Sequence, residues 1–386
     1  MKHSIAARME HIAPFHVMKL LARAKELEAQ GKIVVHMEIG EPDFDTPAPI
    51  VMAGINALDK GYTHYTPALG LDELRVAIAD FYKSNDGIDV DKNRIVVTPG
   101  SSSALQLVCG AVINPGDEVI LTDPGYPCNK QFVQIAGGIP SFVELDEENN
   151  YQLTLDAVKN KWTENTRAIM LASPSNPTGV LIDTKTLDDI AAFAEEKNAY
   201  LILDEIYHGL VYDEDVKSFV GRHENVFIIN SFSKYFCMTG WRAGWLVAPE
   251  EFIDSIDRLA QNIFLAASTV AQHAALEAFK PATIDILESY RMEFKERRDY
   301  LYKALNDLGF GMKGKPQGAF YLYANSAKFS DNSFQLAEDL LENINVAITP
   351  GIDFGKHLAQ EHVRFAYTRS IDQLELGVSR LASYLK

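Results

Sequence analysis

One lysine in this sequence lies in an unusual setting for a charged side chain. Lys234 occurs in the stretch SFSKYFCMTGWRAG, residues 231–244, directly after the largely apolar run 225–230. Apolar surroundings and a nearby cation disfavour the ammonium form, and Arg242 is a candidate for that cation. Because the neutral amine is a nucleophile toward carbonyl carbon, Lys234 is a candidate for Schiff-base chemistry. The alternative, which holds for most lysines, is that the aliphatic part of the Lys234 side chain is buried while its ammonium group reaches solvent at the surface.

Other polar groups follow apolar runs that are typical of strands. Gly100-Ser-Ser-Ser103 follows the run 95–98 and opens a helical pattern. Its hydroxyls and the free N–H groups of the helix suit a phosphate. The alternative is that one of the serines is an ordinary N-cap. Asp204 follows the run 200–203, where it either caps the next turn or holds a ligand cation such as a protonated ring nitrogen. Asn176 follows the run 167–171 and, taken alone, is more typical of a turn.

The elements that must position these residues alternate in type. Between residue 95 and about residue 230, short apolar runs alternate with helical periodicity, which is typical of βαβ units and a mostly parallel sheet. Strands are predicted at 95–98, 118–121, 167–171, 200–203 and 226–229. Because ligands bind where the carboxyl ends of parallel strands meet, the polar residues that follow these runs are expected to converge.

The C-terminal third has a different pattern. After residue 251 the sequence predicts long helices, including a charged one around 289–308, and then short strands at 319–323 and 362–366. We therefore predict an α/β fold with a large domain, a mostly parallel sheet with helices on both faces, plus a smaller α+β domain from the N-terminal arm and the C-terminal third. The predicted boundaries are 1–45 for the arm and part of the small domain, 46–285 for the large domain and 286–386 for the small C-terminal domain.

Composition limits the functional classes. A chain of 386 residues exceeds one average core, and a net charge of −17 without a basic patch argues against nucleic acid as the partner. The cysteines, Cys109, Cys128 and Cys237, are odd in number and lack ligand spacing, so we expect no disulfide framework, no metal site and a reducing, cytoplasmic compartment. No apolar stretch is long enough for a membrane span, and residues 1–8 are not expected to form a signal peptide.

Taken together, the residues at the predicted strand ends are the complement of pyridoxal 5'-phosphate. The serine-rich turn suits the phosphate, and Asp204 would keep the pyridine nitrogen protonated so that the ring accepts electrons. Asn176 and Tyr207 can hydrogen-bond the phenolic oxygen, while Lys234 would hold the aldehyde.

The chain also resembles the class I/II aminotransferases, the fold-type I pyridoxal-phosphate enzymes related to aspartate aminotransferase. The resemblance extends from about residue 38 to residue 365 and rests on motifs in the family's order: Tyr65-Thr-Pro-Ala-Leu-Gly70, Ser175-Asn-Pro-Thr-Gly179, Asp204-Glu-Ile-Tyr207, Ser231-Phe-Ser-Lys234 and Gly240-Trp-Arg-Ala-Gly244. It implies pyridoxal-phosphate-dependent transamination between an L-amino acid and a 2-oxo acid by a ping-pong cycle. It further implies a role in amino acid metabolism or a biosynthetic process, and a homodimer with shared active sites.

The resemblance also implies residue roles. Lys234 matches the lysine that forms the internal aldimine and acts as the base that moves the proton. Asp204 matches the partner of the pyridine nitrogen. Tyr207 and Asn176 match the partners of the phenolic oxygen. The remaining cofactor contacts it implies are Tyr126 on the ring face, Tyr65 from the neighbouring subunit, and Ser101, Ser102, Ser231 and Arg242 around the phosphate. For the substrate carboxylate it implies Arg364, Gly40 and Asn176; the alternative for Arg364 is a surface cation on an edge strand.

The sequence leaves the substrate side chain open. Some bacterial aspartate-specific relatives carry a lysine in the turn that here reads Gly100-Ser-Ser-Ser103, so its absence argues against aspartate, although an arginine from elsewhere can replace it. Aromatic residues near 12–15 and at Phe264 suit an uncharged or aromatic side chain, or else belong to the core. Ser233 and Thr239 are polar without an assigned task and are expected to be structural.

Three other functions compete with transamination. Ser231-Phe-Ser-Lys234 also satisfies S-x-x-K, and Ser330-Asp-Asn332 matches S-D-N, as in acyl-enzyme hydrolases; K-T-G is absent, however, and such a serine should open a helix. A C–S lyase, decarboxylase or synthase can use the same fold and cofactor. A non-catalytic binding module is less favoured, because it would need neither Lys234 nor Asp204.

Overall fold

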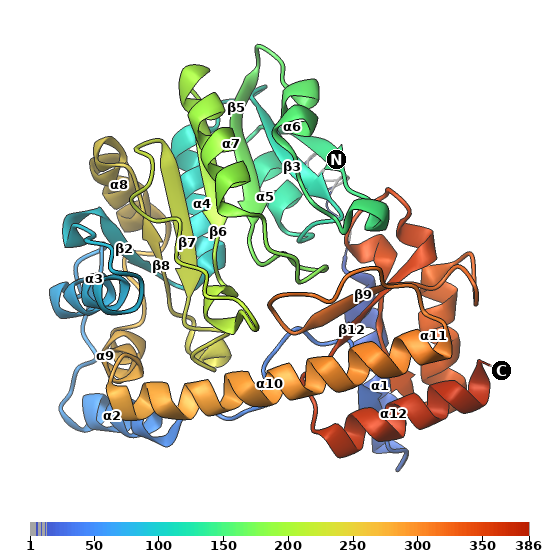
Figure 1. The fold of residues 1–386 in the computed structure, drawn as a ribbon. Helices are drawn as coiled ribbons and strands as arrows, with labels where there is room; N and C mark the ends of the chain where they lie inside the picture. Colours follow the sequence, from blue (N-terminus) through green and yellow to red (C-terminus); the bar gives the residue numbers. More distant parts are fainter. Residues whose placement is uncertain (1–4, 7–8, 10–11, 13, 386) are drawn as a thin grey trace, which may run out of the picture.

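A seven-stranded sheet forms the centre of the larger part of the molecule (Figure 1). In this computed structural model the chain is described at residues 5–6, 9, 12 and 14–385. The strand order is β2-β8-β7-β6-β5-β3-β4, and β8 runs antiparallel to β2 and β7 whereas β3 to β7 are parallel. The strands are β2 Ile95–Thr98, β3 Glu118–Asp123, β4 Ile139–Glu144, β5 Thr166–Ala172, β6 Tyr200–Asp204, β7 Val226–Ser231 and β8 Gly244–Val247. The predicted mostly parallel sheet is confirmed, with β4 and β8 as strands that the sequence did not predict.

Helices cover both faces of this sheet, as predicted. Along β5, Ile169 and Leu171 belong to one apolar cluster while Ala168 and Met170 belong to another. Such continuous apolar runs are needed where a strand is buried on both sides. Helices α3, α6 and α7 contribute to the first cluster, and α4, α5 and α8 to the second. The helices of this part are α2 Ala48–Asp59, α3 Asp72–Asp86, α4 Ser101–Val112, α5 Asn129–Ile135, α6 Leu155–Lys161, α7 Thr184–Glu196, α8 Ile253–Ile263 and α9 Thr269–Ala278.

The smaller part combines both ends of the chain. An antiparallel sheet has the order β11-β12-β9, and β1 pairs in parallel with β10 through Val35 and Val346. Its elements are α1 His16–Ala29, β1 Val35–His36, α10 Pro281–Leu308, β9 Tyr321–Asn325, α11 Ser333–Ile344, β10 Val346–Ala347, β11 Thr349–Pro350, β12 His362–Ala366 and α12 Ile371–Tyr384. The N-terminal arm thus joins the C-terminal third, as the fold class predicted.

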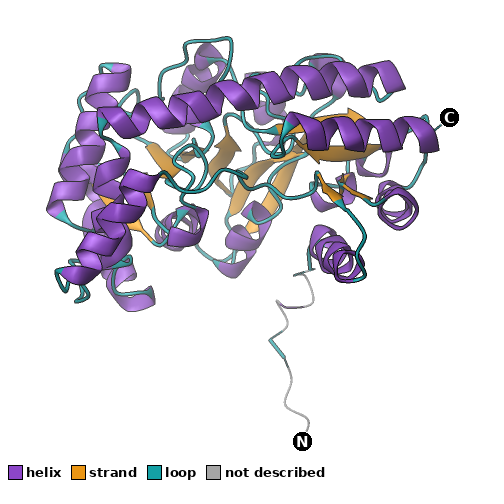
Figure 2. Cartoon of the chain, turned by 90° about the horizontal axis from the view of Figure 1, so that it is seen from below, coloured by secondary structure: helices purple, strands orange, loops and turns teal. Residues whose placement is uncertain are grey.

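The long helix α10 runs along the outside of both parts (Figures 1 and 2). The predicted boundary between residues 285 and 286 falls inside this unbroken helix, and the domain boundaries remain predictions. The described residues leave out part of the predicted arm 1–45. They also leave out most of residues 1–8, where no signal peptide is expected. Over the part of the chain that the structure describes, no helix is long and apolar enough to cross a membrane.

Candidate active site

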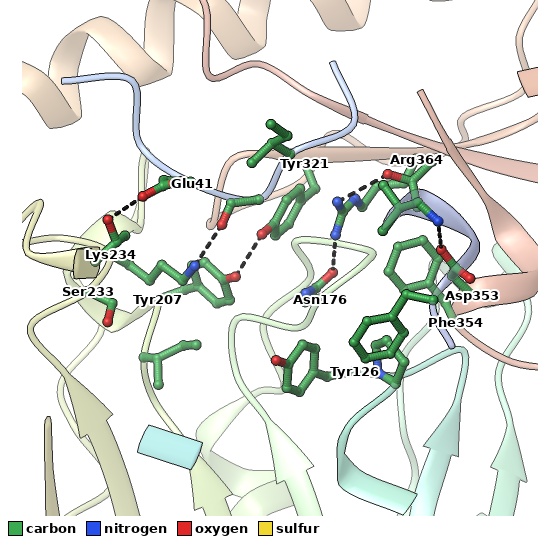
Figure 3. Close-up of a pocket in the computed structure, with 18 of the residues that line it drawn as sticks. Glu41, Tyr126, Asn176, Tyr207, Ser233, Lys234, Tyr321, Asp353, Phe354 and Arg364 are labelled. Carbon is green, nitrogen blue, oxygen red and sulfur yellow. Dashed lines mark hydrogen bonds between the residues drawn. The ribbon is translucent and has the colours of Figure 1, made fainter. Parts of the chain in front are cut away.

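A cavity of about 390 Å³ opens where the carboxyl ends of β5, β6 and β7 face the smaller part of the molecule (Figure 3). Its wall includes most of the predicted site residues: Gly40, Ser101, Ser102, Tyr126, Asn176, Asp204, Tyr207, Lys234, Arg242 and Arg364. Parallel strands deliver their following loops to one edge of the sheet, which explains why residues far apart in sequence meet here.

Lys234 lies three residues beyond β7 and reaches into this cavity (Figure 3). Its Nζ donates a hydrogen bond to the carbonyl oxygen of Gly40 at 2.6 Å and lies 5.8 Å from the ring centroid of Tyr207. Burial lowers the pKa of Lys234 to about 8; the charges of Arg364 and Arg242 act in the same direction. A far larger fraction of the amine is therefore neutral than in a surface lysine, as a nucleophile requires.

Asp204 is the last residue of β6 and is only 4% exposed. One carboxylate oxygen accepts a hydrogen bond from the backbone N–H of Ile206 at 3.1 Å, so the predicted turn contact exists, but the side chain also lines the cavity. Burial raises the pKa of Asp204 to about 7, and the neighbouring Glu205 acts in the same direction. A cationic ligand group at this position would favour the carboxylate form.

The N-terminus of α4 forms another side of the cavity. Gly100 is the N-cap residue and has a φ of 78°, and no side chain caps the helix, so the alternative of an ordinary serine cap does not hold. This positive φ favours glycine, and a Cβ on Gly100 would lie 2.6 Å from Nη2 of Arg242 and displace the guanidinium. Uncapped N–H groups beside Ser101, Ser102 and a guanidinium make a site for an anion such as a phosphate.

Two predicted residues lie off the cavity wall. Ser231 is 1% exposed, and its hydroxyl donates to Oγ of Ser233 at 2.9 Å. Ser233 and Thr239, which were expected to be structural, line the cavity instead. Tyr65 is 83% exposed and away from this wall. The cofactor contacts of Ser231 and Tyr65 therefore remain predictions.

Arg364 lies in the middle of β12 and is only 5% exposed, so the alternative of a surface cation does not hold. Nη1 donates to Oδ1 of Asn176 at 3.0 Å, and Nη2 donates to the carbonyl oxygen of Glu38 at 2.6 Å. The guanidinium carbon lies 4.2 Å from the ring centroid of Tyr321 and 4.8 Å from that of Phe354. The Arg364 side chain lines the cavity, where a guanidinium suits a ligand carboxylate.

Two tyrosines and a glycine connect the two ends of the cavity. The hydroxyls of Tyr207 and Tyr321 lie 2.8 Å apart, and burial raises the pKa of Tyr207 well above its usual value. A Cβ on Gly40 would collide with the hydroxyl of Tyr321, so the backbone can pass here only as glycine. The ring of Tyr126 points into the same space (Figure 3).

Several wall residues were not predicted. The wall also includes Val17, Met18, Leu21, Glu38, Ile39, Glu41, Tyr321, Thr349, Asp353 and Phe354. Phe15, from the aromatic stretch near 12–15, lies on the wall as well, whereas Phe264 packs against the second apolar cluster and is not on the wall. Tyr321 falls in a predicted strand, and Glu41 follows the predicted Gly40, so proximity in sequence was an available signal for both. The carboxylate of Asp353 accepts hydrogen bonds from the backbone N–H groups of His16 and Val17 at 2.8 and 2.9 Å. This contact between residues more than 300 positions apart has no local sequence signal.

Comparison with known proteins agrees with this geometry. The family model described as aminotransferase class I and II matches residues 32–381. The chain belongs to this family. This aminotransferase is 38% identical to a (5-formylfuran-3-yl)methyl phosphate transaminase of Methanocaldococcus jannaschii, with 99% of both chains covered, and 36% identical to a probable aspartate/prephenate aminotransferase of Aquifex aeolicus, with 100% of both covered. An aminotransferase structure from Mycobacterium tuberculosis superposes with a TM-score of 0.96 at 32% identity, covering 100% of this chain and 99% of the other.

The predicted fold, the aminotransferase activity and pyridoxal phosphate as cofactor are thereby confirmed. The acyl-enzyme alternative is wrong for this aminotransferase. Its serine, Ser231, ends a strand instead of opening a helix, and its hydroxyl is buried against Ser233 and the carbonyl oxygen of Ala243.

The residues of the cavity fit pyridoxal phosphate. The uncapped α4 terminus with Arg242 suits the phosphate, and the buried carboxylate of Asp204 suits a protonated ring nitrogen. The amine of Lys234 suits the aldehyde, and the guanidinium of Arg364 on the same wall suits a substrate carboxylate. These groups lie on one cavity wall, as one cofactor and one substrate require.

Proposed function

We propose that this aminotransferase acts on L-amino acids and 2-oxo acids with Lys234 as its reactive amine. The observation that carries this proposal is that Lys234 and Asp204 face one cavity from the ends of neighbouring strands β7 and β6. When bound, pyridoxal phosphate supplies an electron-accepting ring that stabilises negative charge at the substrate Cα. Nζ of Lys234 would hold the aldehyde carbon of the cofactor, and the free amine of Lys234 would take up the proton from the substrate Cα.

The cofactor ring is held by residues on two strand ends and one loop. Asp204 keeps the ring nitrogen protonated, because a buried carboxylate is stabilised by a cation in contact with it. Asn176 and Tyr207 bind the phenolic oxygen, and Tyr126 packs on the ring face. Since the Asn176 Oδ1 already accepts from Arg364, its amide NH2 is the end available as a donor.

Phosphate and substrate occupy opposite ends of the site in this proposal. Ser101, Ser102 and Arg242 bind the phosphate together with the N-terminus of α4. Ser231 contributes indirectly, because its hydroxyl donates a hydrogen bond to Ser233 on the cavity wall. Arg364 binds the substrate α-carboxylate with its planar fork. The backbone at Gly40 and the amide of Asn176 complete the carboxylate site.

The proposal is tested by single-turnover absorbance of the purified holoenzyme. Addition of an L-amino acid should convert the aldehyde form of the cofactor to its amine form with one equivalent of 2-oxo acid, and a second 2-oxo acid should restore the starting spectrum. Lys234→Ala should bind the cofactor and fail to turn over, whereas Lys356→Ala, at a lysine off this cavity wall, should behave as wild type. Release of ammonia or a thiol in place of a returning spectrum would indicate a lyase and contradict the proposal.

We also propose that the enzyme is a cytoplasmic homodimer with shared sites. Tyr65 is 83% exposed, and on α2 the apolar side chains Met52, Ile55 and Leu58 are between 44% and 55% exposed. Exposed apolar groups of this kind favour an interface. The three cysteines are unpaired, which fits a reducing compartment.

Hybrid dimers test the shared site. In a dimer of one Lys234→Ala chain and one Tyr65→Ala chain, one site contains both native residues if Tyr65 acts across the interface. Mixing the two variants under exchange conditions should then restore activity well above that of either alone. Activity that stays at the level of the separate variants would contradict a shared site.

A further inference from the structure

The cavity wall carries few cations, and each already has a task. Among the described wall residues the basic side chains are Lys234, Arg242 and Arg364. Lys234 donates to the carbonyl oxygen of Gly40, and Arg242 donates to the carbonyl oxygen of Thr239 beside the α4 terminus. Arg364 is engaged with Asn176 and the carbonyl oxygen of Glu38. No further basic side chain on the described wall is left for a second substrate carboxylate.

Carboxylates on the same wall outnumber these cations. Besides Asp204, they are Glu38, Glu41 and Asp353. Glu38 is 0% exposed; one oxygen pairs with Nδ1 of His36 at 2.7 Å, and Oε2 has no partner among the described residues. A wall on which carboxylates outnumber basic side chains offers a second anion no net attraction.

The segment at the start of α1 and Phe354 give this wall an apolar portion. Residues at the start of α1 contribute Phe15, Val17, Met18 and Leu21, and Phe354 lies beside Asp353 and Arg364 (Figure 3). Asp353 holds the start of α1 in place by accepting hydrogen bonds from its first backbone N–H groups. Apolar side chains therefore line the space beside the proposed α-carboxylate site in a fixed arrangement.

We propose that this cavity selects amino acids and 2-oxo acids with an uncharged, mainly apolar side chain and disfavours dicarboxylates. This inference rests on the proposed function of the same site. A substrate carboxylate beyond the α-carboxylate would face the apolar side chains of α1 and the carboxylates of this wall, and this chain's described wall offers no further basic side chain to compensate it. An aliphatic or aromatic side chain would instead bury its surface against α1 and Phe354.

The test compares half-reactions of the full-length holoenzyme. Single-turnover kcat/KM is measured by absorbance for L-leucine, L-methionine and L-phenylalanine, and for L-aspartate and L-glutamate. We expect the best uncharged substrate to exceed both dicarboxylates by at least about 30-fold, equivalent to about 2 kcal/mol. A smaller ratio, or a reversed one, overturns this inference while leaving the proposed function intact. If no amino acid converts the cofactor, the proposed function itself fails.

A matched pair of variants locates the determinant on α1. Met18 is 55% exposed and lies at the cavity wall, so Met18→Lys adds a cation there on a stem of similar length that remains in contact with water. Ala22→Lys adds the same charge at an exposed position of the same helix that is off this wall. We expect Met18→Lys to raise kcat/KM for aspartate about tenfold and Ala22→Lys to leave it unchanged. No gain from Met18→Lys, or an equal gain from both, overturns the role of the α1 wall.

Discussion

The environment of Lys234 predicts how the amine of the cofactor-free enzyme titrates. Burial lowers its pKa from 10.5 to about 8, and the charges around it act with opposite signs. A shift of this size makes the neutral amine about 300 times more abundant near pH 7, equivalent to about 3 kcal/mol. Arg364 and Arg242 lower the pKa of Lys234, whereas Glu41 and Asp204 raise it.

Two substitutions change this balance in opposite directions. Arg364→Gln removes a cation and should raise the pKa of Lys234, because the ammonium then meets less repulsion. Glu41→Gln removes an anion and should lower the pKa. Arg222→Gln is the matched control, because Arg222 pairs with Asp188 at the surface and is off the cavity wall.

The assay is the rate of covalent binding of added pyridoxal phosphate by cofactor-free protein between pH 6.5 and pH 11. The rate measured with Lys234→Met is subtracted to remove the contribution of other lysines. The wild-type rate should rise with a midpoint near pH 8, with the midpoint higher in Arg364→Gln, lower in Glu41→Gln and unchanged in Arg222→Gln. A wild-type midpoint near 10.5, or shifts of the same sign in the Arg364 and Glu41 variants, would refute this explanation of the reactive amine.

Three further predictions follow from the other parts of the site. Gly100→Ala should weaken binding of pyridoxal phosphate at least about tenfold in a fluorescence titration, because its Cβ would meet Arg242. Gly116→Ala is the matched control: Gly116 also has a positive φ, but a Cβ there would meet nothing within 4 Å, so this variant should bind the cofactor normally. The pKa of Asp204 is raised to about 7, so this buried group costs no stability below about pH 4, an increasing amount between pH 4 and pH 7, and the full amount above pH 7. Asp204→Asn should therefore stabilise the cofactor-free protein in urea unfolding by up to about 4 kcal/mol at pH 8 and should give no such gain at pH 4; an equal gain at both pH values would contradict the buried charge. Arg364→Lys should raise KM for amino acids about 10- to 100-fold with a smaller change in kcat, because a lysine lacks the planar fork; an unchanged KM would remove Arg364 from the substrate site.

The sequence predicted those parts of the fold and site that depend on local pattern. Asp204 and Lys234 were found because each follows an apolar run, and parallel strands place such positions at one edge of the sheet. Strand β8 was missed because Gly244–Val247 is short and glycine and tryptophan precede it closely, within a stretch that was interpreted only as part of the lysine motif.

Other features of the site depend on contacts between distant segments. Asp353 meets the start of α1, and Glu38 meets Arg364, only after β1 has paired with β10 and β12 with β11. Ser231 was predicted to face the site, but Ser233 lies on the wall in its place. Which of the two serines faces the cavity depends on side-chain direction after β7 ends, where the alternation of a strand no longer applies. Local periodicity contains no information about any of these.

The most direct test of the central claim is to find which residue carries the cofactor. The purified holoenzyme is reduced with borohydride and digested, and the peptide that bears the phosphopyridoxyl group is identified by mass spectrometry. We predict modification of Lys234 in near-stoichiometric yield, and we expect an L-amino acid added before reduction to prevent it. Modification of a different lysine, or labelling that the substrate does not prevent, would contradict the central claim.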